Sequence, residues 1–417
     1  MRIVDLFSGA GGLTFGFYYK LLEGAFIKNN DNEFVFANEV DCHAAEAFRM
    51  NFPDINMICE DVKTLDEARI LGLVGNLPVD IIIGGPPCQS FSTIGKRRYD
   101  DKAKLYIEYM RLLRIIRPKM FLFENVKGML SMHEQIPVLD NDGNEQYDEE
   151  GKIITRPGRL ILDVIKDQFN TLDENRQLGY TLVGESILDA VDYGVPQHRE
   201  RVFLVGARND LLDRIHWTYP RATHGEELER YITLQEAISD FPSLSEGEKK
   251  SEYLQPPRNQ YQKLMRAGSN VLSQHYCGIH NEKIRRVIEA VPQGKGRNYI
   301  NELVERGDLP AFCKLTSGYK NTYGRLVEDR PSTTITNNMC TPSALRCIHY
   351  REHRTLSPRE GARIQSFPDW FVFCGARVNV TSQIGNAVPP LLALQIARQI
   401  ESIIDNLNEQ EEINDAE

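Results

Sequence analysis

Residues 3–13 of the chain read IVDLFSGAGGL, a short apolar run followed at once by a glycine-rich turn. The run Ile3–Phe7 has the length and composition of a buried strand, and a helical pattern begins at Gly12. Glycines let a backbone turn sharply and approach a ligand closely, while a helix start offers free N–H groups to an anion. The stretch therefore predicts the first strand, turn and helix of a nucleotide-binding type of sheet.

The rest of the first half continues this alternation of apolar runs and amphipathic segments. Strand-like runs lie at 34–37, 79–83, 120–123, 180–183 and 201–205, and helical spacing marks 42–50, 103–117 and 160–169. Such alternation indicates a mainly parallel sheet with helices on both faces. We predict an α/β protein with a Rossmann-like, doubly wound sheet, whose ligands bind at the carboxyl ends of the strands.

The pattern changes near residue 216. From there to about residue 323 the chain is rich in Pro, Gly, Arg, Asn and Tyr, and its apolar runs are short and irregular. We predict a larger domain of residues 1–215, completed by 375–417, a smaller irregular domain of residues 216–350, and a hinge at 351–374.

Two further segments carry local expectations. The helical pattern at 390–404 predicts a helix that returns to the first domain before an acidic tail frays. The segment 139–154 contains turn residues and short flanking runs that are typical of a surface hairpin.

The composition excludes several classes of protein. The chain has 417 residues, of which 41% are hydrophobic and 26% charged, and no apolar run approaches the roughly 18 residues of a membrane helix. Its eight cysteines are scattered without a CxxC pair, which argues against a disulfide framework or zinc ribbon and for a reducing compartment. We expect a cytoplasmic protein without a metal site.

The net charge of −10 is unevenly distributed. The segments 134–150 and 401–417 each contain seven acidic residues and no Lys or Arg, so the rest of the chain carries a net charge of +4. Residues 251–330 contain thirteen basic and eight acidic residues. This distribution permits nucleic-acid binding without pointing to it, because a solvated face has the same composition.

The glycine-rich turn and two later acidic positions describe a cofactor site. Glu39 ends the next strand, where a carboxylate can accept hydrogen bonds from ribose hydroxyls, and Asp61 follows the strand after it. Asp61, together with Glu60, is a candidate acceptor for an exocyclic amine. An adenosine-containing cofactor fits this pattern, with NAD, FAD and S-adenosylmethionine as equal alternatives.

The strand at 79–83 leads into the sequence GGPPCQ at residues 84–89. A free cysteine is most often a small buried hydrophobe, but two rigid prolines place Cys88 at the carboxyl end of a strand, where side chains reach ligands. A nucleophilic cysteine needs a neighbour that lowers its pKa or protonates what it attacks. The next strand supplies Glu124 at its own end, and the polar stretch 92–98 suits a DNA-contacting loop.

Six motifs resemble, in order, those of the DNA (cytosine-5)-methyltransferase family of the bacterial restriction–modification type. They are FSGAGG at 7–12, GPPCQ at 85–89, ENV at 124–126, QHRER at 197–201, RPSTTI at 330–335 and QIGNAV at 383–388. The motifs span nearly the whole chain. The resemblance implies an S-adenosylmethionine-dependent methyltransferase sheet with a smaller target-recognition domain at 216–350, and S-adenosylmethionine as the cofactor.

The resemblance also implies a mechanism. The Cys88 thiolate is expected to add to C6 of a cytosine flipped out of duplex DNA, so that C5 attacks the methyl group of the cofactor. Glu124 is implied at the pyrimidine N3, where it supplies a hydrogen bond or proton, and a raised pKa is expected for it. Arg201 is implied at the cytosine O2, with Gln197 and Arg199 in the same site. Structural ion pairs are the alternative for the two arginines.

The family's cofactor residues carry over to the same edge of the sheet: Phe7, Gly9, Gly11, Gly12, Leu13, Glu39, Val40, Asp61, Val62, Pro86, Leu105, Asn386 and Val388. Members often have an aromatic or large aliphatic residue against adenine where this chain has Val40, so we expect a weaker stacking contact. DNA contacts are expected from Ser92 and Arg97, and from Lys295 and Arg297 in a glycine-rich loop, for which a solvated loop is the alternative.

Other functions leave parts of the sequence unexplained. A zinc nucleobase deaminase would use the HxE pattern at His198 and the Pro87-Cys88 pair, but Phe91 stands where its second cysteine belongs. A flavin or NAD oxidoreductase leaves the Cys88 motif unused, and a non-catalytic DNA-binding regulator would not need both Cys88 and Glu124. A tRNA cytosine-5-methyltransferase is the closest alternative, although the long segment between Arg201 and Tyr323 favours DNA.

The expected activity is methylation of cytosine C5 within a specific short sequence of double-stranded DNA. Such an enzyme is expected to protect host DNA from a cognate restriction endonuclease that acts separately, and to work as a monomer. The target sequence itself depends on side-chain placement in an irregular domain, for which one sequence offers no code.

Overall fold

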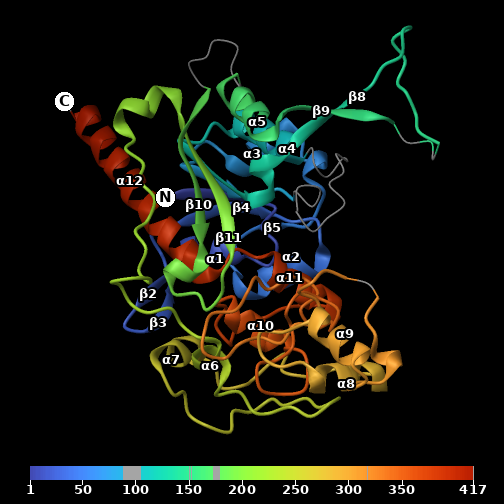
Figure 1. Ribbon diagram of the computed structural model, residues 1–417. Helices are drawn as coiled ribbons and strands as arrows, with labels where there is room; N and C mark the ends of the chain where they lie inside the picture. Colours follow the sequence, from blue (N-terminus) through green and yellow to red (C-terminus); the bar gives the residue numbers. More distant parts are fainter. Residues whose placement is uncertain (88–104, 150, 152, 172–178, 317, 417) are drawn as a thin grey trace.

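A computed structural model describes the chain except residues 88–104, 150, 152, 172–178, 317 and 417 (Figure 1). Its centre is a seven-stranded sheet. In spatial order the strands are β10 (Tyr180–Asp189), β11 (Glu200–Arg208), β7 (Met120–Val126), β6 (Ile81–Gly84), β1 (Arg2–Leu6), β4 (Glu33–Asn38) and β5 (Met57–Ile58).

Strand β11 is the exception to a parallel arrangement. The pairs β1–β4, β1–β6, β4–β5 and β6–β7 are parallel, whereas β11 runs antiparallel to both β7 and β10. The register pairs Arg201, near the start of β11, with Val126, at the end of β7. The first residues of β11 therefore lie at the carboxyl edge of the parallel strands, which is the edge expected to bind ligands.

Helices cover both faces of the sheet, which confirms the doubly wound fold (Figure 1). Ile3 and Ile83 belong to the hydrophobic cluster on one face, and their neighbours Val4 and Ile82 to the cluster on the other. The first face packs against α1 (Gly12–Tyr18), α2 (Cys42–Asn51) and α12 (Pro390–Ala416), and the second against α3 (Glu67–Val74), α4 (Leu105–Ile116) and α5 (Ile161–Asn170). This alternation follows from the period of two along each strand.

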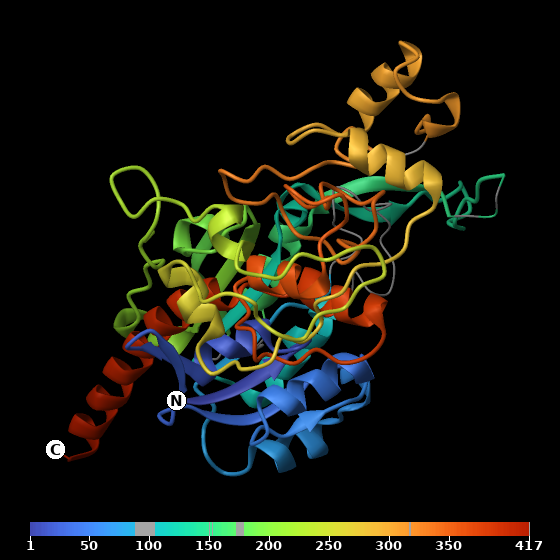
Figure 2. The same ribbon diagram turned by 90° about the horizontal axis from the view of Figure 1, so that it is seen from below.

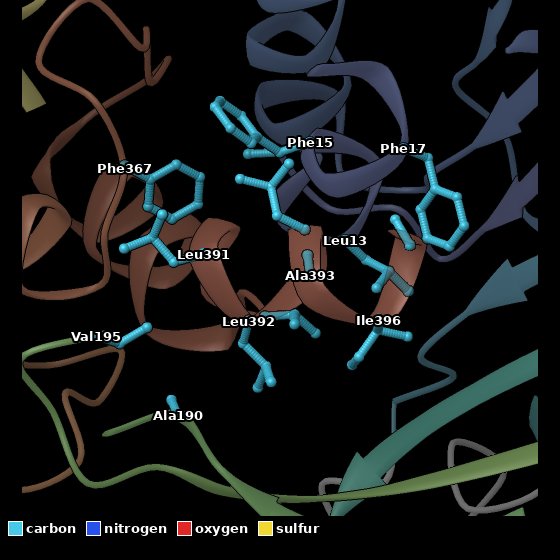
Figure 3. Close-up of a cluster of buried hydrophobic side chains, with 14 of the residues drawn as sticks. Leu13, Phe15, Phe17, Ala190, Val195, Phe367, Leu391, Leu392, Ala393 and Ile396 are labelled. Atoms are coloured by element: carbon cyan, nitrogen blue, oxygen red, sulfur yellow. The ribbon is translucent and has the colours of Figure 1, made fainter. Parts of the chain in front are cut away.

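The first and last helices of the chain pack directly against each other. Leu13 and Phe15 of α1 lie beside Leu391 and Ala393 of α12, within one cluster of buried side chains (Figure 3). A β-carbon added at Gly16 would lie 2.2 Å from the carbonyl carbon of Ala393. The two helix backbones therefore touch, and the end of the sequence closes over the helix that follows the glycine-rich turn.

The prediction that the acidic tail frays after residue 404 is wrong, because α12 continues to Ala416. Polar contacts explain the longer helix. Lys119 Nζ donates to Asn408 Oδ1 at 2.6 Å and to Glu411 Oε2 at 2.8 Å, and Arg214 donates to the Leu407 carbonyl at 2.9 Å. Glu411 of the tail thus meets two basic partners on the sheet domain, Lys119 and Arg214, and these contacts hold the extended helix.

The predicted surface hairpin is present. Strands β8 (His133–Pro137) and β9 (Thr155–Leu160) pair antiparallel, and bridges at Leu139–Glu145 and Tyr147–Ile153 continue the arm. Figure 1 shows this arm projecting from the body of the molecule. A second short hairpin, β2 (Tyr19–Leu22) with β3 (Ala25–Lys28), follows α1.

The second half of the chain is built from short helices and long irregular segments. The helices are α6 (Leu234–Ile238), α7 (Gln260–Arg266), α8 (Glu282–Ala290), α9 (Arg297–Glu305), α10 (Pro358–Ile364) and α11 (Arg377–Asn386). Short 3₁₀ turns lie at η1 (Val62–Thr64), η3 (Lys127–Ser131), η4 (Ala190–Tyr193), η5 (Asn209–Arg214) and η6 (Ala311–Cys313).

Hydrophobic packing in this half forms two groups. Leu234, Met265 and Leu272 share the large cluster with α1 and α12, whereas a separate small cluster contains residues between Val287 and Ile348. The two groups overlap in sequence, because Leu326, Ile335 and Met339 belong to the large cluster. The predicted domain boundaries at 215, 350 and 374 stay a prediction.

The segment predicted as a hinge contains α10, which is wholly buried. The Arg363 guanidinium donates to Asp240 from the preceding segment and to Asp369 beyond the helix, with Nε 3.0 Å from Asp369 Oδ1. These two carboxylates raise the pKa of Arg363 above its usual range, against the effect of burial. Since removal of one partner leaves a buried charge unpaired, this contact fixes α10 between its neighbours.

Candidate active site

Five strand ends and one strand start converge on the carboxyl edge of the sheet. They carry the glycine-rich turn after β1, Glu39 after β4, Asp61 after β5, the Pro-Pro turn after β6, Glu124 near the end of β7, and Arg201 at the start of β11. Because β11 is antiparallel, a residue that follows Glu124 by 77 positions in sequence lies beside it.

Glu124 and Arg201 form a largely buried ion pair. Arg201 Nε lies 3.1 Å from Glu124 Oε1, and the two side chains are only 13% and 12% exposed. Burial raises the pKa of the Glu124 carboxyl, and the charges of Arg201 and Arg199 oppose that shift. The pKa of Glu124 is therefore shifted upward, as expected, and desolvation of the carboxyl causes the shift.

The Pro-Pro turn approaches the Glu124 carboxylate closely. A β-carbon added at Gly85 would lie 2.6 Å from Glu124 Oε2, so a side chain at position 85 would displace the carboxylate. Asn125 Nδ2 also donates to the Pro86 carbonyl at 3.3 Å, which fixes the ends of β6 and β7 to each other. Cys88, which follows this turn, lies outside the described residues, as do Ser92 and Arg97.

Gln197 and Arg199 lie behind this pair, wholly buried. Arg199 donates to the carbonyls of Ile335 at 3.1 Å and Gly385 at 2.8 Å. Gln197 accepts a 2.6 Å hydrogen bond from the Ile335 backbone N–H and donates to Gln365 Oε1 at 2.9 Å. Both side chains therefore join the segment before β11 to the motif at 330–335, and Arg199 also contacts the motif at 383–388.

This arrangement favours a positioning role for Gln197 and Arg199. The segment at 332 pairs in parallel with the segment at 197, through two backbone hydrogen bonds of 2.8 and 2.9 Å. Arg199 Nε is buried without a hydrogen-bond partner among the described residues, and burial lowers the pKa of its guanidinium well below the usual range. The catalytic role that sequence assigned to both residues stays a prediction.

The glycine-rich turn has the backbone form of a ligand-binding loop. Phe7, Gly9 and Gly11 have φ angles of 58°, 56° and 94°, in the left-handed region that glycine adopts without strain. The Gly9 backbone N–H donates to Glu39 Oε2 at 2.9 Å, and the Asp41 N–H donates to Glu39 Oε1 at 2.8 Å. The Glu39 carboxylate thus lies against the turn, and burial raises its pKa. The predicted contact of Glu39 with ribose hydroxyls stays a prediction.

The last motif closes over the same turn. A β-carbon at Gly12 would lie 2.5 Å from the Val388 carbonyl oxygen, so this close contact requires glycine. Leu13 and Val388 are buried there, and Asn386 is exposed, with its amide donating to Ser382 Oγ at 3.1 Å. Segments 376 positions apart in sequence therefore share one wall of the candidate cofactor site.

The remaining cofactor candidates differ in exposure. Val40 is 63% exposed beside Glu39, which leaves an apolar surface available to a flat ring. Asp61 is exposed and accepts from the Lys63 backbone N–H at 3.0 Å, whereas Val62 is buried. Glu60 is paired with Arg69, so Asp61 is the freer of the two acids. Leu105 begins α4 and is half-buried.

Sequence reasoning missed two polar residues beneath this edge. Asn38 Nδ2 donates to the carbonyls of Ile58 and Glu60, at 3.1 and 2.9 Å, and so fixes the segment before Asp61. Asp5 is only 1% exposed inside β1, where Thr14 donates to one carboxyl oxygen and the other has no described partner. The signal for Asp5 was available, since a charged residue within a buried strand is unusual.

Two further features are absent among all the described residues. No three His, Cys, Asp or Glu side chains in the described part of the chain lie together as metal ligands would. No helix among those residues is long and apolar enough to cross a membrane.

A family model for C-5 cytosine-specific DNA methylases matches residues 1–150 and 152–402. The chain belongs to this family. The type II methyltransferase M.DdeI of Desulfomicrobium norvegicum is 33% identical, over 98% of this chain and 90% of that protein. The type II methyltransferase M.AgeI of Thalassovita gelatinovora is 30% identical, over 97% of this chain and 100% of that protein.

A solved structure shares the fold. It is described as a DNA modification methyltransferase encoded within an Escherichia coli prophage, and it superposes with a TM-score of 0.68 at 22% identity, over 97% of this chain and 99% of that one. The chain is thus a DNA (cytosine-5-)-methyltransferase of the type II restriction–modification kind. This family and its fold imply S-adenosylmethionine as the methyl donor.

The buried Asp5 carboxyl predicts a pH-dependent stability. Burial raises its pKa to about 8, above the usual value near 4. Its favourable contribution is therefore complete below about pH 4 and is lost as the pH rises through 8. Asp5→Asn should remove this loss, so that urea unfolding shows the variant gaining stability relative to wild type between pH 5 and pH 8.

The exposed Asp213→Asn variant is the control, and its stability should follow the wild-type curve across the same range. A constant difference between Asp5→Asn and wild type over pH 5–8 would contradict a raised pKa at Asp5.

Proposed function

We propose that the enzyme methylates C5 of a cytosine flipped out of a specific short sequence in double-stranded DNA, through a covalent bond between Cys88 and C6. Its biological role in this proposal is to protect host DNA from a cognate restriction endonuclease that acts separately. The enzyme acts as a monomer in the cytoplasm. The observation that carries the proposal is the buried Glu124–Arg201 pair beside the turn that leads to Cys88.

In the first step the Cys88 thiolate adds to C6 of the ring, and electron density moves toward C5 and N3. Glu124 donates a hydrogen bond or proton at N3, and a raised pKa supports this role because it keeps the carboxyl protonated to higher pH. Arg201 donates to the cytosine O2 and orients Glu124. Gln197 and Arg199 position this pair through the backbones of 335 and 385.

S-adenosylmethionine, when bound, supplies an electrophilic methyl group for C5. The described residues fit such a cofactor: the Glu39 carboxylate lies against the glycine-rich turn, and each of its oxygens has a further lone pair for a ribose hydroxyl. Val40 offers the exposed apolar surface on which an adenine ring can rest. After methyl transfer a base removes the C5 proton, the bond from Cys88 to C6 breaks, and the thiolate returns.

The direct test of this function is transfer of labelled methyl groups to duplex DNA by wild type and Cys88→Ser. Label should appear at C5 within one short sequence, mapped by bisulfite sequencing, and the substitution should abolish it. Labelling of tRNA in place of DNA would assign the enzyme to the RNA-acting relatives. If wild type transfers label to no nucleic acid, the protein would be a non-catalytic regulator.

Glu124→Gln tests the proton at N3. The amide keeps the shape and a hydrogen-bond donor but cannot transfer a proton, so kcat should fall by about 10²–10⁴ while cofactor affinity stays the same. In wild type the protonated carboxyl is lost as the pH rises through its raised pKa, which gives kcat/KM a falling alkaline limb that Glu124→Gln should lack.

The exposed Glu226→Gln variant, far from the sheet edge in sequence, is the control and should keep wild-type kinetics. An unchanged kcat in Glu124→Gln would show that the carboxyl proton is not used in the reaction.

A further inference from the structure

A second concave site lies within residues 287–348, the range of the small hydrophobic cluster. It is separate from the carboxyl edge of the sheet. It is a pocket of about 260 Å³ whose polar lining includes Lys295, Asn298, Tyr299, Lys320, Asn321 and Arg346. Its residues come from the glycine-rich loop at 294–296, the start of α9, the turn at 320–321 and the segment at 346. Sequence reasoning selected only Lys295 from this group.

The segments that line the pocket are fixed to one another by backbone contacts. The Arg297 N–H donates to the Thr322 carbonyl at 2.9 Å, and the Arg346 N–H donates to the Asn321 carbonyl at 3.1 Å. A β-carbon at Gly324 would lie 2.6 Å from Cγ of Arg346, so the arginine stem packs directly on that backbone. The pocket is therefore a built feature rather than a chance arrangement of loops.

Ion pairing separates the basic side chains of this region into two groups. Arg285, Arg286, Arg306, Lys314 and Arg330 each lie within 4.0 Å of a carboxylate. The other six basic side chains between residues 281 and 348 have no salt bridge to a described residue, and three of these six, Lys295, Lys320 and Arg346, line the pocket.

The remaining cations of this region are used inside the protein. Arg325 is buried and donates to four backbone carbonyls, and Lys283 donates to the carbonyl of Lys314. Arg297, which sequence selected as a DNA contact, donates from Nε to the Leu315 carbonyl at 3.1 Å and from Nη1 to the Gly318 carbonyl. Arg297 thus supports the loop that carries Lys320.

The pocket lining carries a net positive charge. Three cations face one acid, the exposed Glu302, and the two asparagine amides and the Tyr299 hydroxyl add neutral hydrogen-bond donors. A set of lysine and arginine donors around a shallow polar hollow suits a phosphate group. Figures 1 and 2 show α8 and α9 on the same side of the molecule as the β8–β9 arm.

We propose that this pocket binds phosphates of the DNA backbone beside the target sequence, an inference that rests on the proposed function. Lys295, Lys320 and Arg346 make the contacts, and Arg297 positions the loop. Phosphate contacts fix the register of a protein on a duplex without reading its sequence. The pocket therefore contributes affinity and salt dependence, and base recognition belongs to other side chains.

The test measures the affinity of the full-length enzyme for a duplex that contains its target sequence, over a range of salt concentrations. Each phosphate contact contributes about 0.9 to the slope of log K against log[salt]. Lys320→Ala and Lys295→Ala should each reduce that slope by about 0.9, and the triple variant with Arg346→Met by about 2.7. Affinity for a duplex of unrelated sequence should fall by the same factor.

Arg306→Ala is the matched control, because it removes a basic residue of the same region that is already paired with Asp308. Its salt slope should equal that of wild type. If wild type methylates DNA normally but the salt slopes of Lys320→Ala and the triple variant are unchanged, the pocket assignment is overturned. The proposed function would still stand. Absence of any DNA methylation by wild type would instead overturn the proposed function.

Two further outcomes would also overturn the assignment. A changed pattern of methylated sequences in the variants, read by bisulfite sequencing, would mean that these side chains contact base edges. The affinity of wild type for inorganic pyrophosphate can be measured by calorimetry. If it exceeds the affinity for DNA and is lost in the triple variant, the pocket takes a free phosphate ligand.

Discussion

The direction of one strand determines how this active site is assembled. Because β11 runs antiparallel to β7, its first residues meet the end of β7, and Arg201 lies beside Glu124. A parallel β11 would place Arg201 at the opposite edge of the sheet, more than a strand length away. The ion pair depends on this reversal, whereas the approach of the Pro-Pro turn to Glu124 follows from the parallel pairing of β6 with β7.

A buried network then joins that pair to distant parts of the chain. Arg199 and Gln197 precede β11 and contact the backbones of 335 and 385, while the motif after 385 packs on Gly12 of the glycine-rich turn. The site for the base and the site for the cofactor therefore share one set of backbone contacts. This explains why motifs from both ends of the sequence must be present together. Figure 3 shows the same closure in the core, where α12 packs against α1.

Much of this arrangement was predictable from local sequence. The alternation of apolar runs with helical segments predicted the sheet, and the same reading placed Glu39 at the end of a strand. The contact between Glu39 and the Gly9 N–H follows from those elements alone. The raised pKa of Glu124 was expected from the family resemblance, and burial supplies it.

Other features depend on contacts between distant residues, which local patterns do not encode. The tail was expected to fray, but Lys119 and Arg214 both pair with its Glu411. Arg297 stands in a basic loop like a DNA contact, yet its guanidinium donates to carbonyls, while Lys320 and Arg346 have no sequence signal. Contacts between distant residues decide which basic side chains stay unpaired. Charge counts alone therefore do not identify a binding surface.

The central claim is that the chemistry proceeds through a bond between Cys88 and C6 of the cytosine. It is tested most directly with a duplex in which the target cytosine carries fluorine at C5, because no base can remove fluorine as a cation. With S-adenosylmethionine present, wild type should accumulate a protein–DNA adduct that survives denaturation, with one added methyl group by mass and the link mapped to Cys88. Efficient methylation of ordinary DNA without any such adduct, or an adduct in Cys88→Ser, would contradict the account.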